Sequence, residues 1–414
     1  MRIFPKRKIF LDHAGATPLD KGVLKKINFL NRFIYSNPSS IFSEGVKARN
    51  LIEEARKDIA KTIGAHSDEI IFTGSGTESD ALAILGTIRS FRLKNKGVTP
   101  HIITTQIEHP AVLENVRWLE KNNLAEVTYL APKENGILDS KEIRKNIKPN
   151  TVLVSIMYAN NEIGTIQPIE EIAKEIRHFK KNNFSSETDS SYPIFHTDAC
   201  QAMNYLFTKN IEKLGVDLMT FNGSKIYGPK GIGVLYKKRS IDLEPLYKGG
   251  GQEFNLRSGT ENTSLIVGLA QALKKTEAIK EKENLRLIKM RDCVIGQILE
   301  LEKKFPFKII LNGDREKRLA NNINISIFGL SSELIVLELG ARGVFVSERS
   351  DCKSGNNSFS YVLESIYGKQ IEEGKKIGSL RITLGRKTKK RDLKILVKSI
   401  KSVFKKYGAW ADLN

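Results

Sequence analysis

The stretch FNGSKIYGPKGIGVLY (221–236) carries Lys225 between the end of one apolar strand and a Gly-Pro-Lys-Gly turn that leads into the next strand. Glycine and proline are the residues that interrupt strands and form turns. A lysine that is desolvated at such a position can have a lowered pKa and can form an imine with an aldehyde. Most lysines are solvated surface charges, so this stretch alone leaves Lys225 open as a catalytic or a surface residue.

Strand-like and helix-like segments alternate on both sides of this stretch. Helical stripes or helix-start prolines separate the strands, as at residues 45–63, Pro110 and Pro168. Alternating apolar strands and helices predict an α/β fold with a mostly parallel central sheet covered on both faces. The predicted strands lie in IIFTGSGTE (70–78), HIITT (101–105), AEVTYL (125–130), TVLVSIM (151–157), PIFHTDA (193–199), VDLMTF (216–221) and GIGVLY (231–236).

The pattern changes after about residue 262. A long Lys/Glu-rich helix is followed by NNINISIF (321–328), another helix and SLRITL (379–384), which together predict a smaller α+β domain. We therefore expect three parts: an N-terminal arm (1–19) that packs with the small domain, a large domain (20–280) and a small C-terminal domain (281–414). The polar segment NNFSSETDSSY (182–192) is typical of a surface loop.

Composition excludes several classes of protein. Of the 414 residues, 40% are hydrophobic and 28% are charged, which are globular proportions. Three widely spaced cysteines, Cys200, Cys293 and Cys352, predict neither a disulfide framework nor a Cys-rich zinc site, and we expect no metal. No apolar run reaches the roughly 18 residues that span a bilayer, and the N-terminus lacks the apolar core of a secretory signal. A soluble, cytoplasmic protein is the expectation.

The net charge of +20 raises the question of an acidic partner. Residues 374–406 contain thirteen Lys or Arg and one acid, Asp392, while Leu393, Ile395, Leu396, Val397, Ile400, Val403 and Phe404 recur mostly at helical spacing. The lysines fall largely on the other face. A solvated polar face is favoured, a docking surface for an acidic protein is the alternative, and nucleic acid comes last because no aromatic residues interleave with the basic ones.

Two further motifs point to one cofactor. TDACQ (197–201) places Asp198 at a predicted strand end, and ligands of open α/β sheets bind beyond the carboxyl ends of the strands. An aspartate facing a pyridinium nitrogen and a lysine imine are the protein groups that pyridoxal 5′-phosphate (PLP) needs. GSGTES (74–79) adds backbone N–H groups and Thr77 at a helix start, which suits a phosphate. The three motifs together predict a PLP site.

At this point the sequence resembles the cysteine desulfurases of the NifS/IscS-like type, within the class V aminotransferase group of fold-type I PLP-dependent enzymes. The resemblance covers nearly the whole chain and implies the same fold, a large PLP-binding domain with a smaller α+β domain. The motifs that carry it, in chain order, are FLDHAGATPL (10–19), SNPSS (36–40), TGSGTES (73–79), EHPAV (108–112), NNEIGTIQP (160–168), HTDACQ (196–201), SKIYGPKGIGVLY (224–236), RSGTEN (257–262) and SLRITLGR (379–386).

The resemblance also implies a role for each matching residue. Lys225 would form the imine with the cofactor, Asp198 would face the pyridine nitrogen, and His109 would stack on the ring, although a histidine at a helix start is more often a cap or core residue. Arg381 would bind the substrate carboxylate through its planar guanidinium. The remaining contacts would be Gln201 and Asn161 near the ring oxygen, Gly76, Thr77 and Ser224 at the phosphate, and Thr260 at the phosphate of the neighbouring subunit, which implies a homodimer.

Cys352 is the expected nucleophile. It lies in the polar stretch VSERSDCKSGNNSFS (346–360), before a helix expected near Ser360 and 29 residues before Arg381 (381 − 352). A structural cysteine usually has apolar neighbours, whereas a polar, exposed setting suits a reactive thiol. Cys200 lies inside the cofactor motif and Cys293 in a predicted helix, so both are expected to be structural.

Several residues depart from the family pattern. Ser224 stands where histidine is usual, and a serine hydroxyl cannot act as an acid–base group at neutral pH. Asn222 stands where a phosphate-binding serine is common, and Phe42 where a histidine usually follows SNPSS. Around Cys352 the chain has charged residues in place of small ones: Glu348, Arg349, Asp351 and Lys353. Their opposite effects on the thiol pKa leave its direction open.

The resemblance implies an enzyme that converts L-cysteine into L-alanine and a persulfide on Cys352. An acceptor protein of iron–sulfur cluster assembly or tRNA thiolation would take the sulfur. The first alternative is a related class V lyase or aminotransferase such as a selenocysteine lyase. The second is a catalytically impaired paralogue, which Ser224 and the charged cysteine segment suggest.

Overall fold

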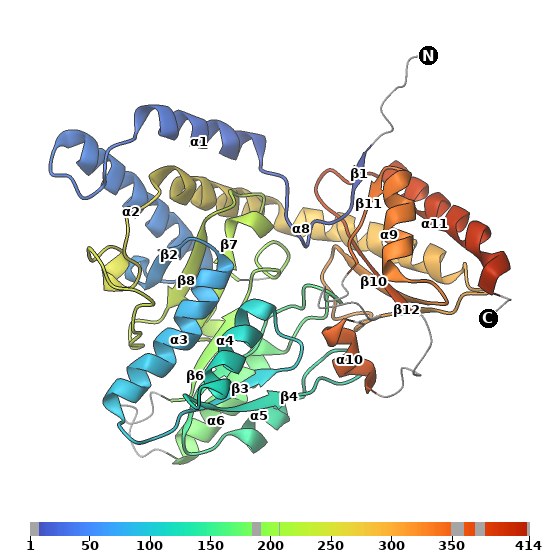
Figure 1. Cartoon of the computed structure of the whole chain (residues 1–414). Helices are drawn as coiled ribbons and strands as arrows, with labels where there is room; N and C mark the ends of the chain where they lie inside the picture. The colour runs from blue at the N-terminus through green and yellow to red at the C-terminus, as the bar shows by residue number, and fades with distance from the viewer. Residues whose placement is uncertain (1–7, 184–191, 207, 349–359, 369–376, 412–414) are drawn as a thin grey trace.

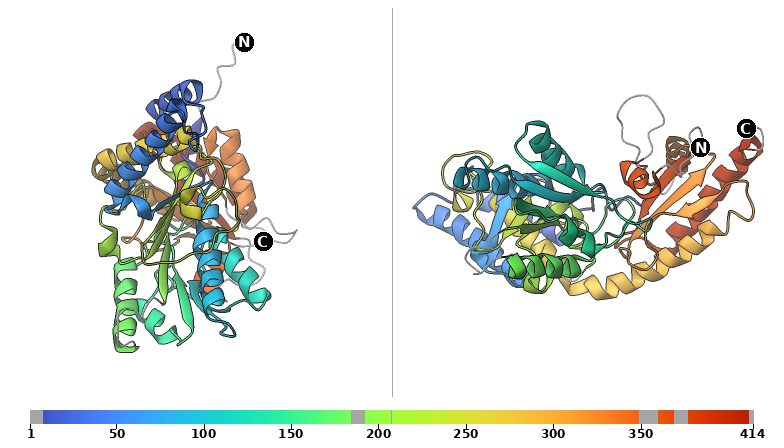
Figure 2. Two further views of the ribbon diagram at one scale, coloured as in Figure 1. Left: turned by 90° about the vertical axis from the view of Figure 1, so that its left-hand side faces the viewer. Right: turned by 90° about the horizontal axis from the view of Figure 1, so that it is seen from below.

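The computed structural model describes residues 8–183, 192–206, 208–348, 360–368 and 377–411 (Figure 1). They form a large and a small lobe. The long helix α8 (Thr263–Leu299) begins against the large lobe and continues along the small one, as the right-hand view of Figure 2 shows. The division expected after residue 280 stays a prediction, and residue 280 lies within α8.

Seven strands of the described residues form the sheet of the large lobe. All neighbouring strands are parallel except β8, which is antiparallel to both β2 and β7. The exception has a local cause, because β7 and β8 are joined by the short Gly-Pro-Lys-Gly connection and not by a crossover helix. In spatial order the strands are β2 (Ile70–Thr73), β8 (Gly233–Lys237), β7 (Leu218–Asn222), β6 (Ile194–Asp198), β5 (Thr151–Ser155), β3 (His101–Thr105) and β4 (Glu126–Leu130).

Both faces of this sheet are covered by helices. Consecutive strand residues point to opposite faces, and they divide between two buried clusters. Ile71, Ile102 and Leu153 pack with α3 and α4, whereas Phe72 and Ile103 belong to the cluster that includes α2, α6 and α8. The helices of this lobe besides α8 are α1 (Lys21–Phe33), α2 (Ser43–Ile63), α3 (Gly76–Lys94), α4 (Pro110–Lys121), α5 (Ser140–Asn146), α6 (Ile169–Asn183) and α7 (Ile211–Leu214). The predicted mostly parallel, doubly covered sheet is therefore present.

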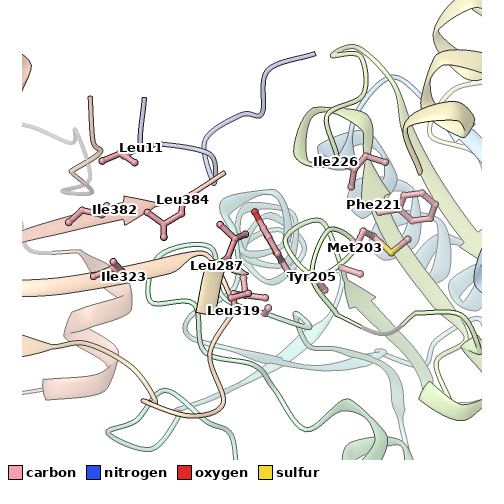
Figure 3. Packing of buried hydrophobic residues seen from close by; sticks show 14 of the residues in the cluster. Leu11, Met203, Tyr205, Phe221, Ile226, Leu287, Leu319, Ile323, Ile382 and Leu384 are labelled. Atoms are coloured by element: carbon pink, nitrogen blue, oxygen red, sulfur yellow. The ribbon is translucent and has the colours of Figure 1, made fainter. Parts of the chain in front are cut away.

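The small lobe contains an antiparallel sheet of the described strands β12, β10 and β9 in that order. Its buried residues continue into the core of the large lobe. In Figure 3, Ile323 and Ile382 lie on the small-lobe side, Phe221 on the large-lobe side, and Leu287 of α8 between them, all within one cluster. The elements are β9 (Ile309–Leu311), β10 (Asn322–Phe328), α9 (Ser332–Ala341), β11 (Val344–Phe345), α10 (Tyr361–Tyr367), β12 (Ile377–Thr383) and α11 (Lys390–Ala411).

The N-terminal arm crosses from the small lobe to the large one. Its strand β1 (Ile9–Phe10) pairs in parallel with β11, and the Thr383 N–H donates to the Leu11 carbonyl at 2.7 Å. Further along, the Thr17 N–H donates to the Ser224 carbonyl at 2.8 Å. The arm is thus tied to both lobes on either side of residues 12–16.

The basic C-terminal segment forms α11 as predicted. Leu396, Ile400 and Phe404 are fully buried, but Ile395 is 37% exposed. The assignment of Ile395 to the buried face was wrong, because a helix turns by about 100° per residue and Ile395 lies beside the stripe. Lys389, Lys390, Arg391, Lys394, Lys398, Lys401, Lys405 and Lys406 are exposed, as the polar-face interpretation requires.

Within the described ranges, no helix is both long and apolar enough to cross a membrane. In that same part of the chain, no group of three His, Cys, Asp or Glu side chains is placed to hold a metal ion.

Candidate active site

A cavity of about 240 Å³ lies beyond the carboxyl ends of β5, β6 and β7, where parallel α/β sheets bind ligands. It is bounded by the start of α3, the start of α4 and the N-terminal arm. Eight of the residues singled out in the sequence line it: Gly76, Thr77, His109, Asn161, Asp198, Gln201, Ser224 and Lys225. The roles expected for these residues stay predictions, but the fold brings them to one place.

Asp198 is the last residue of β6. It is buried, and its Oδ1 accepts a hydrogen bond of 2.8 Å from the backbone N–H of Cys200. Burial among sheet residues with a carboxylate at the cavity wall makes a strong site for a cationic ring nitrogen.

Lys225 ends the short helix η2 (Gly223–Lys225), which follows β7 directly. Its Nζ donates to the carbonyl oxygens of Ala14 at 2.7 Å and Gly15 at 2.6 Å. The tight turn depends on Gly223, since a Cβ there would collide with the Pro229 carbonyl. The arm and the turn together hold the amine at the cavity.

The start of α3 forms a corner suited to a phosphate. Ser75 caps the helix by accepting from the Glu78 N–H at 3.1 Å, and Gly76 and Thr77 open the first turn. A Cβ on Gly76 would lie 2.7 Å from Asn222 Nδ2 and 2.8 Å from Cys200 Sγ, so only glycine leaves the corner open. Backbone N–H groups at a helix start attract phosphate.

Two residues that depart from the family pattern contact each other at this corner. Ser224 Oγ donates to Asn222 Oδ1 at 2.9 Å, and Asn222 Nδ2 donates to Cys200 Sγ at 3.3 Å. The hydroxyl of Ser224 is therefore oriented by Asn222, and the two substitutions act as a pair.

His109 is the N-cap of α4. Its Nδ1 accepts the Ala111 N–H at 3.1 Å, so Nδ1 carries no proton in this arrangement and the neutral ring holds its proton on Nε2. The capping role that is common for a histidine at a helix start is present, and the ring lines the cavity as well.

Asn161 gives the sharpest sign of a ligand. It is only 4% exposed, and neither its Oδ1 nor its Nδ2 has a hydrogen-bond partner among the described residues. An unsatisfied buried amide costs about 1–3 kcal/mol, so a side chain placed this way is suited to polar atoms of a bound molecule. Gln201, nearby, donates through Nε2 to the Ala14 carbonyl at 3.0 Å.

Arg381 of β12 lies behind Asn161 and does not line the cavity. Its Nη1 donates to the Asn161 carbonyl at 3.0 Å, and its Nη2 donates to Asp12 Oδ1 at 2.8 Å. The guanidinium is thus 3% exposed and joins the small lobe, the arm and the loop that carries Asn161. Asp12 stands in the quoted motif FLDHAGATPL, but sequence reasoning assigned it no role.

Sequence reasoning missed two buried acids at the site: Asp80, which lines the cavity, and Glu108, which precedes His109. Burial, reinforced by the Asp198 charge, raises the pKa of Asp80 well above its usual range, and burial raises the pKa of Glu108 to about 8. Glu108 is therefore mostly protonated at neutral pH, and burial disfavours the charged form of Asp80. The signal available for Asp80 was an acid one helical turn after Gly76, on a face that must be buried.

His196 and Cys200 are also uncharged. Burial lowers the pKa of His196 to about 4, so the imidazole is neutral at pH 7 and its 3.6 Å approach to Asp80 is not an ion pair. Burial, followed by the Asp198 charge, raises the pKa of the Cys200 thiol, which argues against a thiolate there. Cys293 is exposed on α8.

Two predicted residues lie elsewhere. Thr260 is exposed and does not line this cavity. Cys352 falls outside the described residues, as do its charged neighbours Arg349, Asp351 and Lys353. On either side of that segment, Ser347 exchanges backbone hydrogen bonds of 3.1 and 2.9 Å with Arg381, and Ser360 Oγ donates to Glu162 Oε2 at 2.5 Å.

The fold and the site can now be compared with known proteins. A solved structure entitled "NIFS-LIKE PROTEIN" superposes with a TM-score of 0.84 at 30% identity, covering 96% of this chain and 100% of that one. The chain belongs to the aminotransferase class-V family, whose sequence model matches residues 9–396. The expected fold and family are therefore confirmed, and the family implies dependence on pyridoxal phosphate.

Similar proteins of known family support the same assignment. The chain is 42% identical to "Cysteine desulfurase IscS" of Dictyoglomus turgidum, covering 97% of this chain and 95% of that protein. It is 38% identical to "Cysteine desulfurase IscS" of Methanosarcina thermophila, covering 97% and 93%. The resemblance to NifS/IscS-like proteins is thus confirmed over nearly the full length.

Proposed function

We propose that this chain is a cysteine desulfurase, which removes sulfur from L-cysteine, releases L-alanine and holds the sulfur as a persulfide on Cys352. The observation that carries the proposal is the meeting of Lys225, Asp198 and the unsatisfied amide of Asn161 at one cavity beyond the strand ends. The relatives that share nearly the whole length of the chain are named for this activity.

The residues at the cavity fit PLP. Asp198 would hold the protonated ring nitrogen, His109 would lie against the ring, and Gln201 and Asn161 would receive the ring oxygen. The first turn of α3, with Gly76 and Thr77, and the Ser224 hydroxyl would hold the phosphate. When bound, PLP supplies an electron sink for the carbanion at the substrate Cα.

Lys225 would carry the cofactor and would move the proton. Its Nζ would take the proton from the substrate Cα and would later return one to the product. Ser224 cannot share this task at neutral pH, because a serine hydroxyl does not titrate there. Arg381 would bind the α-carboxylate as the amine enters.

Cys352 would take the sulfur. Its thiolate attacks the substrate sulfur, an S–S bond forms, and the Cβ–S bond breaks with its electron pair left on the carbon skeleton, which is then protonated. Enzyme thiol and cysteine thereby become enzyme persulfide and alanine, with no external oxidant or reductant. The persulfide would pass to an acceptor protein of iron–sulfur cluster assembly or tRNA thiolation.

A homodimer would complete the site. Thr260 is exposed and does not line the cavity of its own chain, which is consistent with a contact to the phosphate in a second copy. Large apolar side chains on α1, on the following loop and on η3 (Glu253–Asn255) are exposed, and such groups favour burial against a partner. They are Phe29, Phe33, Tyr35, Ile41, Phe42 and Phe254.

The direct test is to supply the purified chain with PLP and L-cysteine. We expect alanine to be released in proportion to the sulfur recovered as sulfide with a small thiol reductant. Alkylation of Cys352 should stop persulfide formation, whereas a selenocysteine lyase or aminotransferase without a nucleophilic thiol would be unaffected. A chain that binds PLP and yields no alanine would contradict the proposal.

A further inference from the structure

Asp12 occupies a fixed place beside the proposed substrate-binding arginine. The strand pairing of β1 with β11 ends just before it, and the Ala14 N–H donates to Thr383 Oγ1 at 3.0 Å just after it. Asp12 itself forms a bridge with Thr383 of β12, the strand that carries Arg381. Its backbone is therefore held on both sides.

The side chain of Asp12 is directed at Arg381. Asp12 Oδ1 accepts from Arg381 Nη2 at 2.8 Å, and the Asp12 side chain retains 27% exposure while that of Arg381 has 3%. The carboxylate of Asp12 is thus the more accessible half of the ion pair. A group approaching Arg381 from the solvent side of Asp12 would meet both charges.

Gly15 makes room for this arrangement. A Cβ on Gly15 would lie 2.5 Å from Asp12 Oδ2, so any other residue at position 15 would push the carboxylate aside. The carboxylate folds back over the same short segment whose carbonyl groups hold Lys225. The position of Asp12 is therefore coupled to the geometry of the site.

We infer that Asp12 is a specificity-determining residue, whose carboxylate shares the Arg381 guanidinium with the α-carboxylate of an amino-acid substrate and limits how tightly that carboxylate is held. The inference rests on the proposed function, which gives Arg381 its role. Two carboxylates at one guanidinium repel each other, and they compete for hydrogen bonds from the same N–H groups of Arg381.

Two variants separate charge from position. Asp12→Asn keeps an oxygen that can accept from Arg381 Nη2 but removes the negative charge, so a carboxylate ligand should bind more tightly. Asp12→Ala removes the acceptor too, so Arg381 loses the contact that orients it and a carboxylate ligand should bind less tightly than in Asp12→Asn. Gly15→Ala should resemble Asp12→Ala, because it displaces the same carboxylate.

The measurement is the dissociation constant of the PLP-loaded enzyme for L-alanine, determined from the change in cofactor absorbance. The dissociation constant for ethylamine, which has no carboxylate, is measured in the same way for comparison. We expect Asp12→Asn to bind L-alanine about fivefold more tightly, because the screened repulsion between two carboxylates a few ångströms apart is removed. The affinity for ethylamine should not change. The KM for L-cysteine should fall while kcat stays within about twofold. Asp68→Asn, which removes the exposed pair with Arg239, is the matched control.

The thermal midpoint of the chain before PLP loading is a second readout, which shows that each variant is folded. Equal affinity of wild type and Asp12→Asn for L-alanine, or an equal shift for ethylamine, would overturn the inference, because the effect would then not involve the carboxylate. If the wild type neither bound L-alanine nor produced it from cysteine, the proposed function would fail, and the inference with it.

Discussion

Lys225 and Asp198 come from adjacent parallel strands, β7 and β6, and meet because both strands end at the same edge of the sheet. Lys225 Nζ donates to the carbonyl oxygens of Ala14 and Gly15 in the arm, and these dipoles orient the amine at the cavity. Asp80 and Glu108 lie close enough to Asp198 for its charge to raise the pKa of both carboxyls, in addition to the larger effect of burial.

The substitution Lys225→Ala tests the lysine. We expect it to abolish alanine release and the borohydride-reducible attachment of PLP, because no other amine replaces Nζ at the cavity. Absorbance spectra and intact-mass measurement after reduction report the attachment. A variant that kept both turnover and the reducible adduct would refute the assignment.

The substitution Cys352→Ser tests the nucleophile. The variant should bind PLP and L-cysteine as the wild type does but carry no persulfide, because a hydroxyl oxygen at neutral pH is a poor nucleophile toward sulfur. Mass spectrometry of the untreated enzyme after a single addition of cysteine provides the measurement. Persulfide found on Cys200 or Cys293 would contradict the prediction, and the raised pKa of Cys200 speaks against that outcome.

Glu108 makes stability depend on pH. Its pKa is about 8 in the folded chain and near 4.5 when unfolded, so its contribution is fully present below pH 4.5 and is lost as pH rises toward 8. Glu108→Gln should therefore gain stability relative to wild type by up to about 1.4 kcal/mol per pH unit across this range. Urea unfolding between pH 6.5 and 8 is the measurement, since His196, with a folded pKa of about 4, stays neutral there.

Glu114→Gln is the matched control for this pH series. Glu114 lies on α4, which begins two residues after Glu108, but its side chain is 57% exposed and pairs with Arg117. The difference between this variant and wild type should not change with pH. If Glu108→Gln behaved in the same way, the carboxyl of Glu108 would be ionised in the folded chain.

At the scale of single elements, α10 anchors one end of the segment that contains Cys352. Ser360 Oγ donates to Glu162, next to Asn161, and Tyr361 Oη donates to the Glu108 carbonyl at 2.7 Å, next to His109. Val362, Leu363 and Ile366 pack against Ile107, Met157 and Ile163 in a small buried cluster. This helix therefore holds in place the residues next to His109 and Asn161, two of the proposed cofactor-binding residues.

Helix α11 presents its charge to solvent. Lys389, Lys390 and Lys394 are exposed at its start, and Asp392, the acid nearest to them, is buried and accepts from the Lys389 N–H at 2.9 Å. Among the described residues, the basic side chains of this face have one close acidic partner, Glu338, which forms an ion pair with Lys406. An acidic acceptor would be attracted to it over distances of about a Debye length, roughly 8 Å at physiological salt.

The triple reversal of Lys389, Lys390 and Lys394 to Glu tests this surface. We expect slower sulfur transfer to an acidic protein acceptor at low salt, with the difference fading as salt is added. Alanine release driven by a small thiol should stay nearly unchanged and serves as the internal control. If transfer to the protein acceptor were equally fast at low salt, α11 would be a solvated surface and no docking site.

At the scale of the whole molecule, the large sheet could be predicted because each strand is a continuous apolar run between helices. The pairs β1–β11 and β9–β10 could not, since strands of two or three residues have no measurable periodicity. The antiparallel direction of β8 was missed because apolar runs carry no information on direction. The alternation of strands and helices predicts the parallel pairs, whereas the antiparallel direction of β8 follows from the short connection between β7 and β8.

The site divides in the same way. Gly76, Thr77, Asp198 and Lys225 could be placed because each belongs to a motif at a strand or helix end. The contact of Asp12 with Arg381 joins residues 369 apart in the sequence, and no local pattern reports such a pair. The unsatisfied amide of Asn161 and the raised pKa values of Asp80 and Glu108 depend on burial, which only three-dimensional packing defines.

The tie between the arm and β12 has a consequence for how the protein is made. The arm leaves the ribosome first, yet the Leu11 and Thr383 atoms that meet are separated by 372 residues of chain still to be translated. At the usual pace of about 5–20 residues per second, the arm waits roughly 20–70 s for its partner. During that interval Arg381 has not been synthesised, so the large sheet can form before the proposed carboxylate-binding residue is present.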